Sequence, residues 1–159
     1  MTNSDNGEKI FKDLLEKIIG DTFTPWEWEG YIPYNLVEAR PIGVYLYDVI
    51  LLESVDKAIE KYKRIKGSPL KESFIFDEEQ LDGLGAQMIK EKKMENAIAL
   101  LKLNIEEYPD SANAYSSMGE AYRLNGQSDL AIENYEKSLE LDPHNSRVRE
   151  ILRQIKNNQ

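Results

Sequence analysis

The single histidine is the side chain of this sequence whose type is most often used for acid–base catalysis or metal binding. His144 stands in an Asp-Pro-His-Asn turn, and the chain has neither a second histidine nor a cysteine. A transition-metal site built from protein side chains therefore lacks its usual ligands. Acid–base catalysis needs partners that converge on the imidazole, and no such group is apparent in the sequence. We predict that His144 is a solvated loop residue and that the chain needs no metal and no cofactor.

Acidic residues are plentiful enough to form carboxylate pairs. One cluster, 77–79, lies where a helix is expected to begin, and negative charge is favoured at that end of a helix. A second cluster, Glu106, Glu107 and Asp110, lies near an expected helix end, and we interpret it as a solvated face. The sequence contains neither a glycine-rich phosphate loop nor the spacing of a calcium loop. These carboxylates therefore predict no catalytic site.

The charge balance excludes several kinds of partner. The chain has 159 residues, with 20 basic and 29 acidic side chains and a net charge of −9. Neither half is basic, so we expect no nucleic-acid interface and no binding to an anionic membrane surface. The longest apolar stretch, 41–52, contains Asp48 and is too short to cross a bilayer, and the N-terminus has no signal-peptide pattern. We expect a cytoplasmic protein if the sequence is complete, whereas the location is open if it is a fragment of an exported protein.

Aromatic residues gather in the segment 21–40. Trp26, Trp28 and Tyr31 lie there among prolines and a glycine, which favour a loop or short turns. Trp and Tyr combine a large apolar body with a polar tip and are favoured as binding anchors. The alternative is that these rings cover the open edge of a helical stack, and we favour burial.

An internal repeat of 34 residues organises the C-terminal half. When the sequence is shifted by 34, residues 78–111 fall on 112–145 without a change of register. Each unit has the apolar periodicity of two amphipathic helices joined by a short turn. The small or helix-breaking residues coincide, namely Gly85 with Gly119, Ala97 with Ala131 and Pro109 with Pro143. Each proline ends a second helix, and each mid-helix glycine indicates that a neighbouring helix passes too close for a side chain.

Helix starts and turns in the repeats can be predicted as well. Asp77 is the expected N-cap of the first unit, with Phe76 and Leu81 at the spacing of a hydrophobic staple. Gly126 is suited to the turn between the helices of the second unit, and Lys92 takes its place in the first unit. After the repeats, residues 146–157 carry one apolar stripe on a strongly charged helix, which is typical of a terminal capping helix.

The N-terminal half is less regular. Residues 8–19 predict an amphipathic helix that ends at Gly20. Residues 42–52 and 55–66 predict a helical pair, with Ser54 as N-cap of its second helix. We interpret this pair as a degenerate extra repeat with a longer connection at 67–77, in which Phe74 and Phe76 pack down. A third hairpin matters because about three hairpins are needed to bury a repeat's apolar face.

The 34-residue units resemble the tetratricopeptide repeat family. The residues at the family's signature positions in the second unit are Tyr115, Met118, Gly119, Tyr122, Gly126, Ala131, Tyr135 and Pro143. The first unit departs more, with Leu81, Met88, Lys92 and Asn104 at such positions. The resemblance covers 78–157 and implies an all-α, helix-turn-helix repeat solenoid with a capping helix, which follows an irregular, aromatic-rich N-terminal segment.

The same resemblance implies a groove for a protein or peptide partner, because first helices line the concave face in the family. The outward positions there are Glu79, Asp82, Ala86, Ile89, Asn113, Ser116, Glu120 and Arg123. A subclass of the family grips an acidic peptide terminus with Lys, Asn and Arg at such positions. Asp82 and Ala86 stand where Lys and Asn would be needed, so that mode is not expected here. An acidic face suits a basic or mixed peptide.

The order of elements along nearly the whole chain is also similar to the C-terminal extension of serine beta-lactamase-like hydrolases. The similarity rests on a leading helix, a Tyr/Pro-rich linker, the entry Pro41–Gly43, the helix 55–62 and the paired repeats. It implies an accessory region whose catalytic domain is absent. The family's nucleophile lies in Ser-x-x-Lys, which occurs at Ser54–Lys57 and Ser68–Lys71. The second Ser/Tyr motif and the Lys/His-Thr/Ser-Gly strand are missing, and no β-sheet is predicted, so we interpret Ser54 as a helix cap and Ser68 as a turn residue.

The sequence thus predicts five segments: 1–40 with the N-terminal helix and aromatic loop, 41–77 with the degenerate hairpin, 78–111 and 112–145 with the two repeats, and 146–159 with the capping helix. The function we predict is a non-catalytic protein–protein interaction or scaffolding module. The alternatives are the accessory region of a hydrolase and self-association through exposed aromatic residues.

Overall fold

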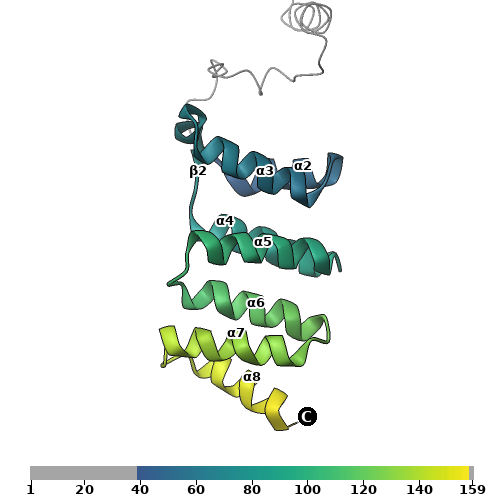
Figure 1. Cartoon of the computed structure of the whole chain (residues 1–159), viewed down its shortest axis with the longest axis vertical. Helices are drawn as coiled ribbons and strands as arrows, with labels where there is room; N and C mark the ends of the chain where they lie inside the picture. The colour runs from purple at the N-terminus through teal and green to yellow at the C-terminus, as the bar shows by residue number, and fades with distance from the viewer. Residues whose placement is uncertain (1–38, 158–159) are drawn as a thin grey trace, which may run out of the picture.

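The computed structural model describes residues 39–157. The predicted helix at 8–19 and the segment with Trp26, Trp28 and Tyr31 lie outside the described residues. Within 39–157 the chain forms three helical hairpins and a final helix, stacked along one axis (Figure 1). The hairpins are α2 (Ile42–Leu52) with α3 (Val55–Lys66), α4 (Glu78–Lys90) with α5 (Met94–Glu107), and α6 (Ala112–Leu124) with α7 (Ser128–Leu141).

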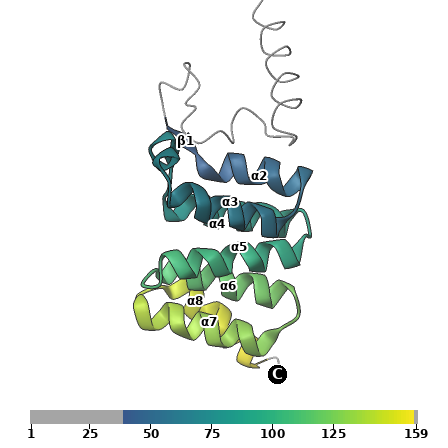
Figure 2. The ribbon, with the colours of Figure 1, turned by 45° about the horizontal axis from the view of Figure 1, so that its top comes forward.

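The helices form two layers. In the first layer α4 contacts both α2 and α6, and in the second layer α3 contacts α5 (Figure 2). The final helix α8 (Ser146–Asn157) packs on α7 through the predicted apolar stripe, since Val148, Ile151 and Leu152 join the buried cluster of Tyr135. This arrangement confirms the predicted all-α repeat solenoid with a capping helix.

Side-chain caps begin α3, α4 and α6. The Oγ of Ser54 accepts a hydrogen bond from the amide of Lys57 at 3.2 Å, and the Oδ1 of Asp77 accepts one from the amide of Gln80 at 3.1 Å. Ser111 caps α6 in the same way. Each cap satisfies one of the backbone donors that a helix start leaves unpaired. The predicted caps Ser54 and Asp77 are therefore confirmed.

The turns inside the two regular hairpins have the same geometry. Lys92 has φ +62° and Gly126 has φ +74°, so both lie in the left-handed region. In each hairpin the next residue closes the turn, because Lys93 N–H donates to the Met88 carbonyl and Gln127 N–H donates to the Tyr122 carbonyl, both at 2.9 Å. This is the pairing of a Schellman motif. Lys92 therefore occupies, with a side chain, the conformation that glycine adopts most readily.

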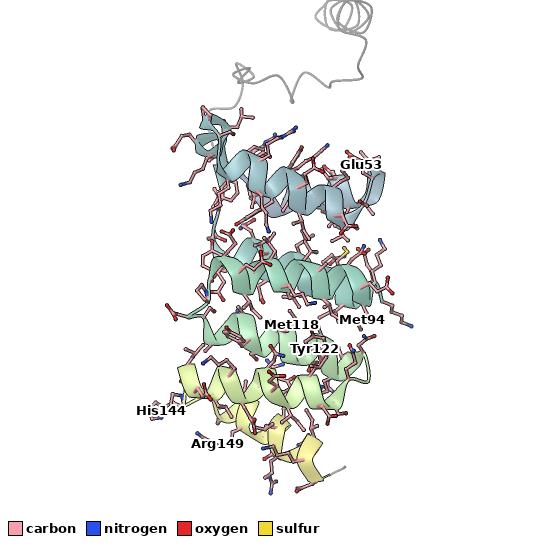
Figure 3. The ribbon with its side chains drawn as sticks, viewed as in Figure 1. Glu53, Met94, Met118, Tyr122, His144 and Arg149 are labelled. Atoms are coloured by element: carbon pink, nitrogen blue, oxygen red, sulfur yellow. The ribbon has the colours of Figure 1, made fainter. Side chains whose placement is uncertain are left out.

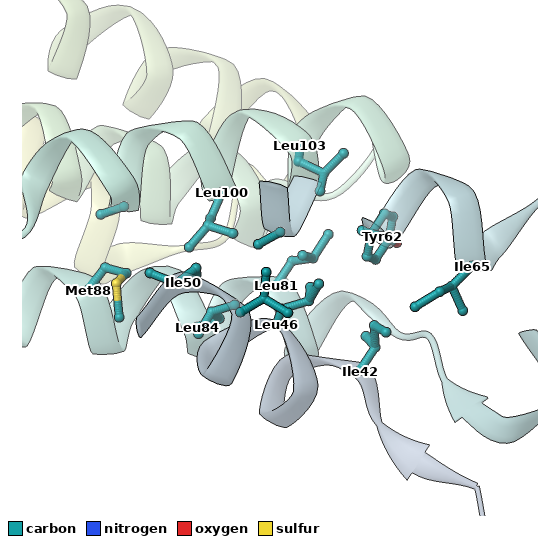
Figure 4. Packing of buried hydrophobic residues seen from close by; sticks show 13 residues of the cluster. Ile42, Leu46, Ile50, Tyr62, Ile65, Leu81, Leu84, Met88, Leu100 and Leu103 are labelled. Carbon is teal, nitrogen blue, oxygen red and sulfur yellow. The ribbon is translucent and has the colours of Figure 1, made fainter. Parts of the chain in front are cut away.

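The largest buried cluster joins α2, α3, α4 and α5 (Figure 4). Tyr62 is 1% exposed and meets Phe76 edge-on, with ring centroids 5.1 Å apart. Phe74 packs against Tyr45 at 5.6 Å. The prediction that Phe74 and Phe76 pack down is confirmed. The extra hairpin therefore shares one core with the first regular repeat, as repeat stability requires.

The prediction that the chain contains no β-sheet is wrong at one place, the connection at 67–77. This connection contains a 3-10 turn, η2 (Pro69–Ser73), and then β2 (Phe74–Ile75), which pairs in parallel with β1 (Arg40–Pro41). Pro41 keeps Arg40 extended, because a residue before proline is disfavoured in the α region. Phe74 then lies opposite Arg40, whose guanidinium stands 5.4 Å from the ring centroid. The β1–β2 pair holds the start of α2 beside the segment that leads into α4.

Candidate functional site

The eight predicted groove residues lie on two adjacent helices of the first layer. Their spacing of three, four and three residues puts each set of four on one side of its helix. Because α4 and α6 contact each other, the two sets lie on neighbouring helices, and we call them together the α4–α6 face. The face consists of Glu79, Asp82, Ala86 and Ile89 on α4, and Asn113, Ser116, Glu120 and Arg123 on α6.

These residues differ in how much of each side chain is free. Glu79, Ala86, Asn113 and Arg123 are exposed, whereas the other four are half-buried. Ile89 packs against both the large core and the neighbouring cluster of Leu101 and Met118. Ile89 therefore mainly joins two buried clusters, and only part of its side chain is accessible at the surface.

Glu120 and Arg123 are engaged with each other. The guanidinium donates to both carboxylate oxygens at 2.7 Å, and the Tyr135 hydroxyl donates to Glu120 Oε2 at 2.8 Å. The hydrogen bond from Arg123, followed by that from Tyr135, lowers the pKa of Glu120 against the opposing effect of burial. Burial, with help from Glu120, raises the pKa of the Tyr135 hydroxyl. The charges of this pair largely cancel on the α4–α6 face.

The α4 side of the face is acidic. Asp82 is half-buried, and its Oδ1 is buried without a hydrogen bond to any residue in 39–157. Glu79 is exposed one turn earlier on the same helix. On α6, the Nδ2 of Asn113 donates to Glu78 Oε1 at 3.4 Å, a long bond that leaves the amide accessible. Apart from the Glu120–Arg123 pair, the face therefore presents an exposed carboxylate, a half-buried carboxylate, an alanine and an amide.

A groove between α2 and α4 was not predicted. It has a volume of about 420 Å³ and is lined by Gly43, Val44 and Tyr47 on α2 and by Glu79, Gln80, Gly83, Leu84 and Gln87 on α4. A Cβ on Gly43 would lie 2.9 Å from the Gln80 carbonyl oxygen, so the glycine is what lets the two helices approach. Gly43, two residues after Pro41, is the one signal in the sequence that points to this close approach.

A hydrogen-bonded cluster includes Tyr47 and Gln87, two residues that line that groove. Glu91 Oε1 accepts from the Tyr47 hydroxyl at 2.8 Å and from Gln87 Nε2 at 2.7 Å, and Lys93 Nζ lies 2.7 Å from Glu91 Oε2. The hydrogen bond from Lys93, with those from Gln87 and Tyr47, lowers the pKa of Glu91 to about 2. The cluster ties α2 to the turn between α4 and α5.

The residues considered for catalysis have structural partners. Ser68 Oγ accepts from the amide of Leu70 at 3.2 Å and donates to the Ile65 carbonyl at 2.9 Å, while Ser54 caps α3. Lys57 Nζ pairs with Glu60 at 2.8 Å. His144 is exposed in its turn, at the edge of the stack where Figure 3 labels it. Across residues 39–157 no three His, Cys, Asp or Glu side chains gather closely enough to hold a metal ion.

The fold and this surface define a helical-repeat protein. Residues 112–145 match the sequence profile of the family described as Tetratricopeptide repeat, so the chain carries a tetratricopeptide repeat at the position predicted for the second unit. No curated protein matches the chain in sequence.

Solved structures share the fold at low identity. The first tetratricopeptide repeat domain of Spaghetti (RPAP3), bound to the HSP90 peptide SRMEEVD, is 20% identical with a TM-score of 0.51, over 74% of this chain and 89% of that one. The first such domain of human RPAP3 is 21% identical with a TM-score of 0.51, over 73% and 87%. A double mutant of MamA RS-1 is 18% identical with a TM-score of 0.52, over 95% and 84%. None of the helices within 39–157 has the length and hydropathy needed to cross a bilayer.

Proposed function

We propose that the chain is a non-catalytic protein-interaction module that holds a segment of a partner protein on the α4–α6 face. The observation that carries this proposal is the set of outward groups there, Glu79, Ala86 and Asn113, which the core does not use. The Spaghetti domain, which has the same fold, binds a peptide. That likeness supports the proposal at the level of the fold.

The charges of the face specify the partner's chemistry. Glu79 and Asp82 form no ion pair with another residue of 39–157, whereas Arg123 is neutralised by Glu120. The face therefore presents net negative charge. Such a surface selects a segment with basic side chains, because like charges across an interface are strongly disfavoured. An acidic peptide such as SRMEEVD is a poor ligand by the same reasoning.

The experiment is a selection from a random peptide library displayed against the full chain, followed by affinity measurements on the selected peptides. Selected peptides should carry net positive charge, and Glu79→Lys should weaken them about tenfold, the size of one lost charge-assisted contact. Glu133→Lys makes the same charge change at an exposed site on α7 and should leave affinity within about twofold. Selection of acidic peptides, or equal effects of the two variants, would refute the proposal.

The non-catalytic part of the proposal has its own test. The full chain should not turn over a β-lactam or a simple ester, because the hydroxyls of Ser54 and Ser68 are engaged with the backbone. Turnover that Ser68→Ala abolishes would contradict it.

A further inference from the structure

The two ends of the described stack differ in polarity. At one end α8 turns charged and amide side chains outward, namely Arg147, Arg149, Glu150, Arg153, Gln154 and Lys156. At the other end α2 exposes Val44 at 64%, Leu51 at 53% and Leu52 at 84%, with Asp48 as the only charged residue of the helix. Repeat proteins require terminal caps with a polar outer face for solubility. The α2 end lacks such a cap among residues 39–157.

The exposed side chains of α2 form a stripe. Val44, Leu51 and Leu52 follow a spacing of seven and eight residues, so they lie on one side of the helix, opposite the buried Ile42, Leu46 and Val49. Val44 also lines the groove between α2 and α4, which continues this apolar surface. We call these three residues together the α2 stripe. Figure 2 shows α2 at the end of the stack away from α8.

We propose that residues 8–19 of the same chain form a helix that covers the α2 stripe. The segment Glu-Lys-Ile-Phe-Lys-Asp-Leu-Leu-Glu-Lys-Ile-Ile places its six apolar residues on one half of a helix and its charged residues on the other. As a helix its twelve residues are about 18 Å long, close to the length of about 16 Å for α2. Its charged half supplies the polar outer face that the α2 end lacks.

The connection favours this occupant over an outside partner. Residues 20–38 join the segment to the start of the described stack, and 19 residues reach roughly 60 Å when extended, which is ample for either orientation of the helix. A tether of that kind gives an effective concentration in the millimolar range. A free partner with the same apolar face would have to exceed that concentration or bind more tightly.

Hydrogen exchange of the full chain tests the proposal. Amides of 8–19 should exchange at least tenfold more slowly than in an unstructured chain, and Leu51→Asp should remove that protection. Leu130→Asp is the matched control, because Leu130 is also an exposed leucine, 38% exposed, but lies on α7. Absent protection in the wild type, or protection that survives Leu51→Asp, would overturn the proposal. Protection that rises with protein concentration would also overturn it, in favour of a second copy.

Engineered disulfides give a second readout that does not depend on Leu51→Asp folding. The chain contains no cysteine, so introduced pairs are the only thiols present. Leu14→Cys with Val44→Cys should oxidise within one chain at least tenfold faster than Glu16→Cys with Val44→Cys, because position 16 lies on the charged half. Equal rates for the two pairs would mean that the apolar half of the helix does not face the α2 stripe, and this result would overturn the proposal.

Discussion

Two glycines of α4, only two residues apart, should respond in opposite ways to the same substitution. A Cβ on Gly85 would lie 2.7 Å from both Cγ and Cδ2 of Leu101, whereas a Cβ on Gly83 meets nothing within 4 Å. Replacing a mid-helix glycine by alanine gains about 1 kcal/mol from helix propensity at either site. The difference between Gly85→Ala and Gly83→Ala therefore isolates the contact with the second helix of the hairpin.

The size of that contact follows from the packing of Leu101. Its side chain is fully buried in a cluster with Met118 and Ala121, so its branch point cannot move without displacing α6. Overpacking of this kind costs about 1–3 kcal/mol. After the propensity gain is subtracted, Gly85→Ala should be destabilised by up to about 2 kcal/mol, while Gly83→Ala is stabilised by about 1 kcal/mol.

Chemical denaturation of the full chain, followed by helical circular dichroism, measures both variants. In a thermal melt, a difference of 1–3 kcal/mol corresponds to roughly 2–12 °C between their melting temperatures. In a Leu101→Ala background the penalty of Gly85→Ala should shrink, because the clashing atoms are gone. The reasoning fails if Gly85→Ala is as stable as Gly83→Ala, or if its cost is the same with and without the Leu101 side chain.

Three further predictions concern single positions. Lys92→Gly should stabilise the chain by about 1 kcal/mol, because Lys92 has φ +62°, and an unchanged denaturation midpoint would contradict this. Asn104 is fully buried and its side chain has no hydrogen bond within 39–157, whereas Ser138, at the matching position of the second repeat, donates to the Ala112 carbonyl at 2.7 Å. Asn104→Ser should therefore raise the free energy of unfolding by about 1 kcal/mol, and earlier unfolding would contradict this. The pKa of Glu91 is lowered from 4.5 to about 2, so its contribution to stability is complete above pH 4.5 and is lost as the pH falls towards 2. The gap in melting temperature between wild type and Glu91→Gln should therefore close over that range, and a constant gap would count against the assignment.

The sequence predicted those parts of the fold that periodicity and local chemistry determine. Helices at 42–52 and 55–66 were predicted with their observed bounds, since apolar spacing and the Ser54 cap are local signals. The close approach at Gly85 and Gly119 was predictable because glycine is costly inside a helix and needs a reason. The β1–β2 pair was not predicted, because a ladder of two residues depends on a register between segments 34 residues apart and leaves no periodic signal.

The positions of the eight candidate residues on their helices were predictable, whereas the contacts that those residues make were less so. The resemblance to the repeat family, together with spacing, assigned eight residues of α4 and α6 to one face. It did not show that Ile89 packs into two clusters, since that depends on the neighbouring helices. The pairing of Glu120 with Arg123 had a usable signal, because opposite charges three residues apart on a helix are neighbours. The groove between α2 and α4 follows from the packing of the degenerate hairpin, which the repeat pattern does not describe.

The two repeats show how one framework carries two different surfaces. Gly85 faces Leu101, and 34 residues later Gly119 faces Tyr135, so the same close contact is made by an aliphatic side chain in one unit and by a ring in the other. The ring brings a hydroxyl that reaches Glu120, and Glu120 in turn holds Arg123. The corresponding positions of the first unit are Ala86 and Ile89, which match the apolar Leu101.

Each repeat therefore has an internally consistent set of three residues. In the first set Ile89 packs on the cluster of Leu101, and in the second set three polar groups bond to one another. Truncating Leu101 leaves an apolar contact of Ile89 unfilled, and removing Glu120 leaves the hydroxyl of the buried Tyr135 without its partner, both of which are costly. The polarity of the side chains on the α4–α6 face thus follows from the buried residue that packs against the glycine of each repeat, Leu101 in the first and Tyr135 in the second. In the function we propose, a partner contacts the acidic residues of α4, because in the second repeat Glu120 and Arg123 neutralise each other.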